Sequence, residues 1–188
     1  NIAIRYGAEG ANLTTAAACA SSTQSVGEAF RAVKAGYADA IIAGGTEAVL
    51  NPLAFGGFFN AHALSLSEDP LRASLPFSAD RGGFVMAEGA AVLILEEYGH
   101  ACRRGAQIIA ELTGYGNNCD AYHPTAPRPD GVPAARAMSD ALTQSGYRPG
   151  ESLYINAHGT GTQLNDKAET KAIKLALGEE AARRVSIS

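Results

Sequence analysis

One cysteine, Cys19, lies in the segment LTTAAACASSTQSV, among side chains that are almost all too small to shield it. Further along, the segment NAHGTGTQLND places His158 immediately before a Gly-Thr-Gly-Thr run that carries Thr160 and Thr162. A cysteine thiolate can hold an acyl group as a thioester, and a neutral histidine can donate a hydrogen bond to a developing oxyanion. These residue types indicate acyl transfer through a covalent intermediate, provided that the fold brings them together.

Each of these residues also has an ordinary structural explanation. Cysteine is usually a small buried hydrophobe, and a lone histidine is more often a satisfied structural residue than a catalytic one. The surroundings of Cys19 favour chemistry, because Val26, Ala29, Phe30 and Val33 form one helix face shortly after it. A helix N-terminus beside the thiol would favour the thiolate and offer amide groups to a negatively charged oxygen.

The elements that must position these residues alternate between strand and helix. Strands are predicted over 12–14, 38–50, 89–98 and 106–116, from 151 into the glycine-threonine turn, and at 183–188; helices are predicted over 23–35, 98–105, 132–146 and 165–178. In the last helix we expect Asp166 to cap the free amides while Glu169 reaches back, a capping-box spacing. The alternation implies an α/β fold with a largely buried sheet.

Composition excludes several classes of function. A chain of 188 residues with 46% hydrophobic residues is long enough for about one domain. The net charge of -4 and the pI near 5.6 argue against nucleic acid and anionic membrane surfaces as partners. No apolar run approaches the length of about 20 residues that a membrane-spanning helix needs. Three widely spaced cysteines fit neither a disulfide framework nor a metal site, so a reducing compartment, the cytoplasm, is expected.

The two reactive segments, TAAACASS and NAHGTGT, together resemble those of the β-ketoacyl-acyl carrier protein synthases, the condensing enzymes of fatty acid synthesis, which have the thiolase fold. Other similar segments follow in the family's order: AGGTEA, PFSADRGGFVMAEGAAVLILEEY, DAYHPT and GTQLNDKAET. DAYHPTAP and NDKAET are similar to the synthase II branch in particular. The resemblance implies a layered α-β-α-β-α architecture, incomplete in this chain, with 1–104 in the N-terminal half and 105–188 in the C-terminal half.

The resemblance also implies roles for individual residues. Cys19 matches the nucleophile that accepts the acyl chain, and His158 matches the first of two histidines that assist the decarboxylation of malonyl-acyl carrier protein. The expected products are 3-oxoacyl-acyl carrier protein and CO2. No glycine-rich phosphate loop or dinucleotide fingerprint points to a kinase or a dehydrogenase instead.

Four further residues are implied in substrate binding. Thr160 and Thr162 match residues that hydrogen-bond the phosphopantetheine arm of the carrier protein, and Thr125 matches a threonine of the substrate channel. Phe58 corresponds to a residue that lines the acyl pocket, although core packing explains an apolar side chain there equally well. No metal or resident cofactor is expected, since the substrates arrive on that arm. Acyl carrier protein is the expected partner, and a homodimer the expected assembly.

The chain also departs from the family pattern. It ends at Ser188, before the family's lysine, second catalytic histidine and phenylalanine gate, and the opening strand and helix of the first half are missing too. We therefore expect the central portion of a synthase with an incomplete active site. Alternatives are a polyketide ketosynthase subunit, a Cys/His hydrolase, a non-catalytic partner of the chain-length-factor kind and a fragment without activity. The preferred acyl length stays open.

Overall fold

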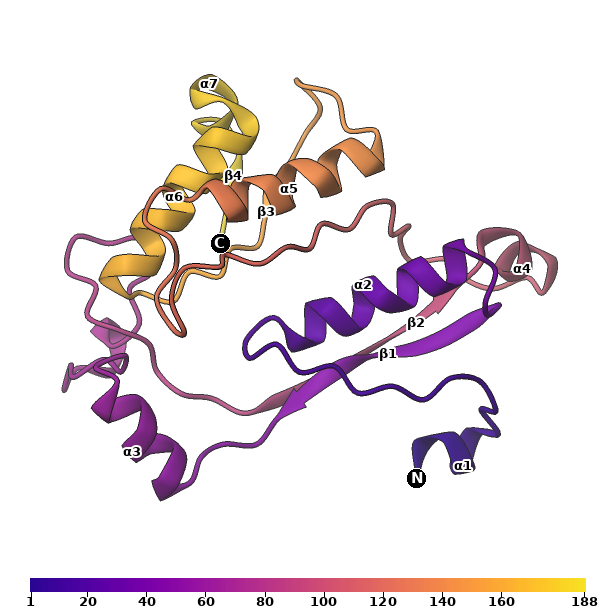
Figure 1. Cartoon of the computed structure of the whole chain (residues 1–188), viewed down its shortest axis with the longest axis horizontal. Helices are drawn as coiled ribbons and strands as arrows, with labels where there is room; N and C mark the ends of the chain where they lie inside the picture. The colour runs from indigo at the N-terminus through magenta and orange to yellow at the C-terminus, as the bar shows by residue number, and fades with distance from the viewer. The chain divides into compact units, whose positions relative to one another are not determined.

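The computed structural model describes residues 1–188 and divides into two compact units. The first unit comprises residues 1–47 and 89–112, and the second comprises residues 48–88 and 113–188. Both contain helices and strands, which confirms the predicted α/β class (Figure 1). None of the helices has the length and apolar character required to cross a membrane.

The first unit consists of a strand pair covered by one long helix. Its elements are α1 (Ile2–Tyr6), α2 (Ser21–Lys34), β1 (Ala40–Glu47), β2 (Gly89–Glu96) and α4 (Tyr98–Arg103). Strands β1 and β2 are antiparallel, with Ala40 opposite Glu96 and Glu47 opposite Gly89. Helix α2 packs along this pair (Figure 1) and buries Phe30 against it. The predicted helix after Cys19 and the two apolar strands are thus confirmed.

Two consecutive glycines allow the close packing of α2 on β1. A Cβ atom added at Gly45 would lie 1.9 Å from Oγ of Ser22, in the first turn of α2. At Gly44 it would lie 2.2 Å from the carbonyl oxygen of Ala91 on β2. Only glycine leaves room for both approaches. The pair therefore fixes the start of α2, and with it the segment that carries Cys19, close to β1.

The second unit is mainly helical. Its elements are α3 (Pro52–Asn60), the 3-10 helix η1 (Pro70–Arg72), α5 (Val132–Ser145), β3 (Tyr154–Ile155), α6 (Gln163–Leu177), α7 (Glu179–Ala182) and β4 (Ser186–Ile187). Helices α5 and α6 pack together, and a Cβ at Gly131 would meet the Ala168 carbonyl oxygen of α6 at 2.7 Å. The predicted helix over 132–146 is thus confirmed as α5, which has Pro133 in its first turn and is capped by Gly146 in the left-handed conformation.

Two expected strands are absent, and one helix was not expected. Residues 12–14 and 106–116 form no strand. In the second segment, Gly114 and Gly116 lie against the carbonyl oxygens of Ala141 and Ala137 on α5. This part of the segment therefore packs alongside a helix and does not pair with a strand. Helix α3 was not predicted, and it begins where Asn51 accepts a hydrogen bond from the Ala54 amide.

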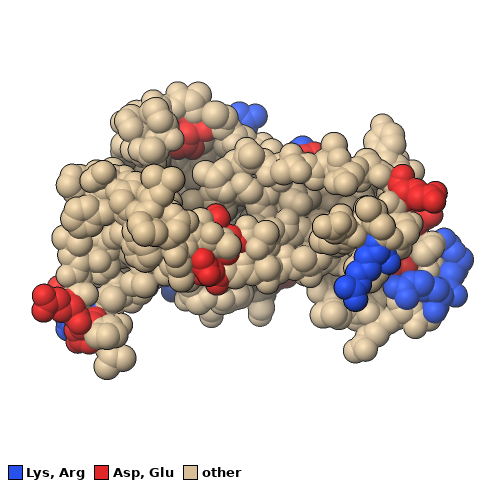
Figure 2. Space-filling view, turned by 90° about the horizontal axis from the view of Figure 1, so that it is seen from below, with Lys and Arg blue, Asp and Glu red and all other residues tan.

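The sheet is also less buried than the apolar strands suggest. Side chains of β2 are exposed from its first residue to Ile94. Apart from proline and glycine, eight apolar residues are buried, four in each unit: Ala29, Phe30, Ala43, Ala101, Ala135, Ala168, Ala172 and Ile173. On the face shown in Figure 2, charged side chains form small separate groups within a largely uncharged surface.

Candidate functional site

Cys19 lies in the first unit, immediately before α2. Its side chain is exposed, and α2 begins two residues later at Ser21, as the sequence predicted. The N-cap residue is Ala20, which offers no side-chain acceptor to the first amide groups of the helix. The thiol is therefore accessible and sits beside a helix end whose amides are not taken up by a capping side chain.

A tight turn fixes the backbone on both sides of Cys19. Ala18 has a left-handed conformation with φ of 47°, which is uncommon for a residue with a side chain. The Ser21 hydroxyl donates to the Ala18 carbonyl at 2.7 Å and accepts from the Ala17 amide at 2.8 Å. Thr15 donates its hydroxyl to the Ser21 carbonyl at 3.1 Å. These bonds hold Cys19 in a defined position at the start of α2.

His158 lies in the second unit, three residues after the end of β3, and is exposed. Strand β3 pairs in parallel with β4, and the pairing continues as the Ala157 amide donates to the Ser188 carbonyl at 2.8 Å. The Glu169 carboxylate accepts from the amides of His158 at 2.7 Å and of Gly159 at 2.9 Å. Glu169 thus does not close the predicted capping box with Asp166, and instead fixes the backbone that carries the imidazole.

Thr160 and Thr162 bring their hydroxyl oxygens to 2.9 Å from each other. Thr162 is the N-cap of α6 and accepts from the Asn165 amide at 3.3 Å. The prediction that Asp166 caps this helix is wrong, because α6 begins at Gln163, upstream of the predicted start. The two hydroxyls and His158 therefore belong to one short turn between β3 and α6, which we call the histidine turn (residues 158–162).

Asp166 instead connects the histidine turn to a distant loop. Its side chain is 2% exposed, with Oδ1 accepting from the Gly161 amide at 3.1 Å and Oδ2 from the Phe77 amide at 2.6 Å. Arg81 lies 3.6 Å from the same Oδ2 and donates to the Thr162 carbonyl at 3.3 Å. The sequence showed no sign of this cluster, because its partners Phe77 and Arg81 lie in a distant loop.

Phe58 lies on α3 and is 40% exposed. Its ring meets that of Phe84 edge to face, with ring centres 5.3 Å apart. The residue before Phe84, Gly83, donates its amide to the Gly161 carbonyl at 2.9 Å. A short series of contacts thus joins α3 to the histidine turn.

Thr125 lies in a separate loop that is closed by a histidine. Nδ1 of His123 accepts from the amides of Thr125 at 3.1 Å and of Ala126 at 3.0 Å. At the far end of this loop, the Val132 amide bonds the Asp130 carboxylate and, together with Arg128, lowers the pKa of Asp130 below its usual value. No hydrogen bond joins Thr125 to the histidine turn, so its place in a substrate channel stays a prediction.

The structure thus gathers His158, Thr160 and Thr162 in one turn and presents Cys19 in a turn of the other unit. The catalytic and binding roles of these residues stay predictions at this point. Nowhere in residues 1–188 do three or more histidine, cysteine, aspartate or glutamate side chains gather closely enough to hold a metal ion.

Comparison with known proteins identifies the family. The sequence profile of the Beta-ketoacyl synthase N-terminal domain matches residues 1–101, and that of the C-terminal domain matches residues 109–188. A 3-oxoacyl-(acyl-carrier-protein) synthase 2 of Synechocystis sp. is 55% identical over 180 residues, which cover 95% of this chain and 43% of that protein. The chain therefore spans less than half the length of this relative.

Solved structures agree with the sequence comparison. A type II polyketide ketosynthase, in complex with its acyl-carrier protein and described as bound to the hexaketide, has a TM-score of 0.94 and 42% identity, covering 99% of this chain and 46% of its own. A ketosynthase from Xenorhabdus doucetiae, in complex with its chain length factor, has a TM-score of 0.81 and 36% identity, covering 95% of this chain and 41% of its own. With the two profiles covering nearly all of its length, and with the thiolase-like fold of the ketosynthases, this chain belongs to the β-ketoacyl synthase family.

Proposed function

We propose that the protein is a 3-oxoacyl-acyl carrier protein synthase of fatty acid biosynthesis. In the proposed first step, the Cys19 thiolate attacks an acyl thioester and the carrier thiol leaves with a proton. In the second, the bond from malonyl carbon to CO2 breaks, and the resulting enolate carbon attacks the Cys19 thioester and releases the thiolate. The observation that carries the proposal is the exposed Cys19 in a fixed turn before an uncapped helix.

The proposed role of His158 follows from its position after β3. An imidazole that donates to the thioester oxygen of the malonyl group would stabilise the enolate without a metal ion. Such a donor must be held in place, because stabilisation by a hydrogen bond depends on preorganised geometry. The Glu169 carboxylate supplies this restraint, because it accepts hydrogen bonds from the His158 and Gly159 amides of the histidine turn.

The threonine pair suits a carrier arm that presents amide groups. Each hydroxyl has one hydrogen to donate. Because one of these hydrogens is used between Thr160 and Thr162, the other remains for a carbonyl oxygen of the phosphopantetheine arm. Phe58 and Thr125 are proposed to line the acyl pocket and the channel. The arm is part of the substrate, and no resident cofactor is proposed.

Acyl carrier protein is the proposed partner, supported by the similar ketosynthase that is solved in complex with one. A homodimer and a cytoplasmic location are proposed as well, with residues 1–104 and 105–188 contributing to the two halves of the fold. The second candidate is a polyketide ketosynthase subunit, because the two similar structures described above include a polyketide enzyme and a partner of a chain length factor.

The first test is mass spectrometry of the whole protein after incubation with acyl-acyl carrier protein. We expect one acyl group, on the peptide that contains Cys19, and none after Cys19→Ser. The matched control is Cys102→Ser, because Cys102 is also exposed. Acylation of Cys102 or Cys119 with none at Cys19 would refute the assignment.

A second test separates the two candidate pathways. With acyl-acyl carrier protein and malonyl-acyl carrier protein, a fatty acid synthase component forms one 3-oxoacyl product per cycle. A polyketide enzyme extends the unreduced product repeatedly. We expect a single addition of two carbons by mass spectrometry, and a ladder of unreduced products would support the polyketide alternative.

A further inference from the structure

Phe77 has an unusual backbone conformation for a bulky residue. Its φ is 62°, in the left-handed region that residues other than glycine, asparagine and aspartate rarely adopt. The buried Asp166 carboxylate holds this conformation by accepting the Phe77 amide at 2.6 Å. Strained residues persist only where their surroundings determine them, and they cluster at functional sites.

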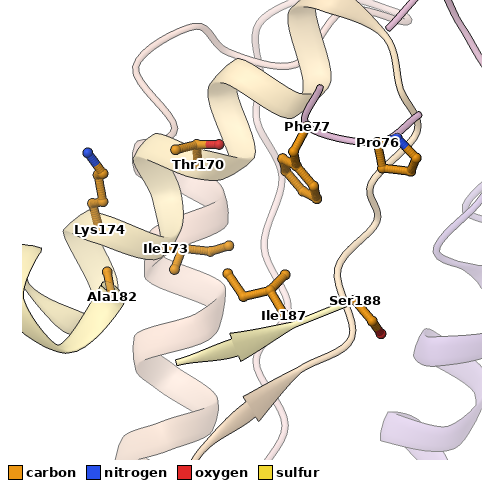
Figure 3. A pocket seen from close by; sticks show the side chains of 8 residues that line it. All are labelled: Pro76, Phe77, Thr170, Ile173, Lys174, Ala182, Ile187 and Ser188. Carbon is orange, nitrogen blue, oxygen red and sulfur yellow. The ribbon is translucent and has the colours of Figure 1, made fainter. Parts of the chain in front are cut away.

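The ring of Phe77 lies against the residue that follows His158. A Cβ added at Gly159 would be 3.3 Å from Cε2 of Phe77 and 3.4 Å from Cβ of Pro76. Gly159 is itself left-handed, with φ of 48°. Figure 3 shows Pro76 and Phe77 beside α6, with the Phe77 ring pointing into a cavity of about 540 Å³ that Ile173 and Ile187 also line. The ring therefore forms a wall of both this cavity and the histidine turn.

One carboxylate sets the position of both segments. Asp166 binds the Phe77 amide with Oδ2 and the Gly161 amide with Oδ1. The loop and the turn are joined a second time where the Gly83 amide donates to the Gly161 carbonyl at 2.9 Å. Glu169 holds Gly159 by its amide at 2.9 Å. The backbone beside His158 is thus restrained by two carboxylates, which accept its amides, and by the Phe77 ring, which packs against it.

We propose that Phe77 is a positioning residue for His158. Its left-handed backbone keeps the ring against Gly159, and the ring fixes the direction in which the turn presents the imidazole. Phe77 touches no reacting atom in this arrangement, so its effect passes through the turn. The inference rests on the proposed function, in which His158 serves decarboxylation and Cys19 serves acylation.

The test is Phe77→Asn in the whole protein. Asparagine tolerates the left-handed conformation, so the substitution removes the ring without forcing the backbone to change. We expect the kcat for decarboxylation of malonyl-acyl carrier protein to fall about 10- to 100-fold, since small displacements of a catalytic group are costly. The KM of that reaction and the rate of Cys19 acylation should be unchanged. Phe77→Tyr keeps the ring and should retain the wild-type kcat.

Leu71→Asn is the matched control, because Leu71 belongs to the same segment and is 90% exposed. Wild-type decarboxylation by Phe77→Asn, equal loss of both reactions, or failure of Phe77→Tyr to retain activity would overturn the proposal. Should Phe77→Asn not fold, Phe77→Leu must show the same selective loss, and a leucine variant with the wild-type kcat would overturn it. A wild-type protein that performs neither reaction would instead refute the proposed function.

Discussion

At the scale of single residues, the sequence revealed the reactive groups but not what holds them. Cys19 and His158 stand out because each precedes a segment with a clear helical pattern. Asp166 was given the wrong role, since spacing alone does not distinguish it from Thr162 as the capping residue. One of its actual partners, the Phe77 amide, lies in a distant loop, and no local pattern encodes such a contact.

A substitution at Thr162 tests the helix cap. Thr162→Val keeps the shape of the side chain but removes the oxygen that accepts the Asn165 amide. We expect the free energy of unfolding to fall by about 1 kcal/mol, the usual value for a lost N-cap. Urea unfolding followed by circular dichroism measures the change. Thr162→Ser keeps the oxygen and serves as the control, and equal stability of the valine and serine variants would contradict the cap assignment.

At the scale of elements, the helices were predicted better than the strands. Helices α2, α4, α5 and α6 follow their apolar spacing and their glycine or proline signals. A strand also needs a partner strand, which the sequence does not identify. Residues 106–116 have the composition of a strand but form no strand in the structure. Helix α3 was missed because its two central glycines and uniformly apolar side chains give no helical periodicity.

The contact of α2 with β1 depends on the lack of a side chain at Gly45. In Gly45→Ala the new methyl group would meet the Ser22 hydroxyl, so α2 must shift away from the strand. We expect a loss of about 1–3 kcal/mol in the free energy of unfolding, as for other overpacked sites, and slower acylation of Cys19. Denaturant unfolding and an acylation time course measure the two effects.

Gly57→Ala in α3 is the matched control for this change. Nothing lies within 4 Å of a Cβ at that position, and alanine favours a helix over glycine by roughly 0.5–1 kcal/mol. We therefore expect the control to stabilise the protein slightly. If Gly45→Ala were as stable as Gly57→Ala, the close approach of α2 to β1 would be disproved.

Glu96 links the end of β2 to α4. Its carboxylate bonds Arg104 at 2.7 and 2.6 Å, and it also bonds Nδ1 of His100. Arg104 first, and His100 second, lower the pKa of Glu96 from 4.5 to about 2. Because the folded-state pKa is the lower one, the ionised carboxylate stabilises the fold above pH 4.5, and this contribution is lost as the pH falls towards 2.

Glu96→Gln should therefore destabilise the protein at neutral pH, and the difference from wild type should shrink as the pH falls below 4.5. Unfolding curves at several pH values for both proteins measure this difference. Glu68→Gln, a change of the same type at an exposed residue, serves as the control. A difference between wild type and Glu96→Gln that stays constant down to pH 2 would contradict the linkage.

At the scale of the whole chain, the buried core is small. Six of the eight buried apolar residues are alanines, which bury little surface each. Large apolar side chains are exposed in both units, among them Leu53, Phe59 and Ile94. The predicted buried sheet would have covered Ile94, and its exposure shows that apolar composition alone does not determine what covers a strand.

This exposure predicts how residues 1–188 behave when they are produced alone. We expect the polypeptide to bind a dye that fluoresces on apolar surfaces, since apolar patches of this kind attract other molecules. The control is the whole protein at equal molar concentration, for which less dye should bind. Equal fluorescence of the two would mean that these side chains are exposed to the same extent in the whole protein.

The parallel pairing of β3 with β4 has a consequence for biosynthesis. The Ala157 amide, next to His158, bonds the carbonyl of Ser188, and the Ser188 amide bonds the Ile155 carbonyl. A ribosome releases β3 well before β4, because synthesis proceeds from the N-terminus. The backbone bonds next to His158 can therefore be complete only after Ser188 has left the exit tunnel, and a nascent chain that stalls earlier lacks the partner strand of β3.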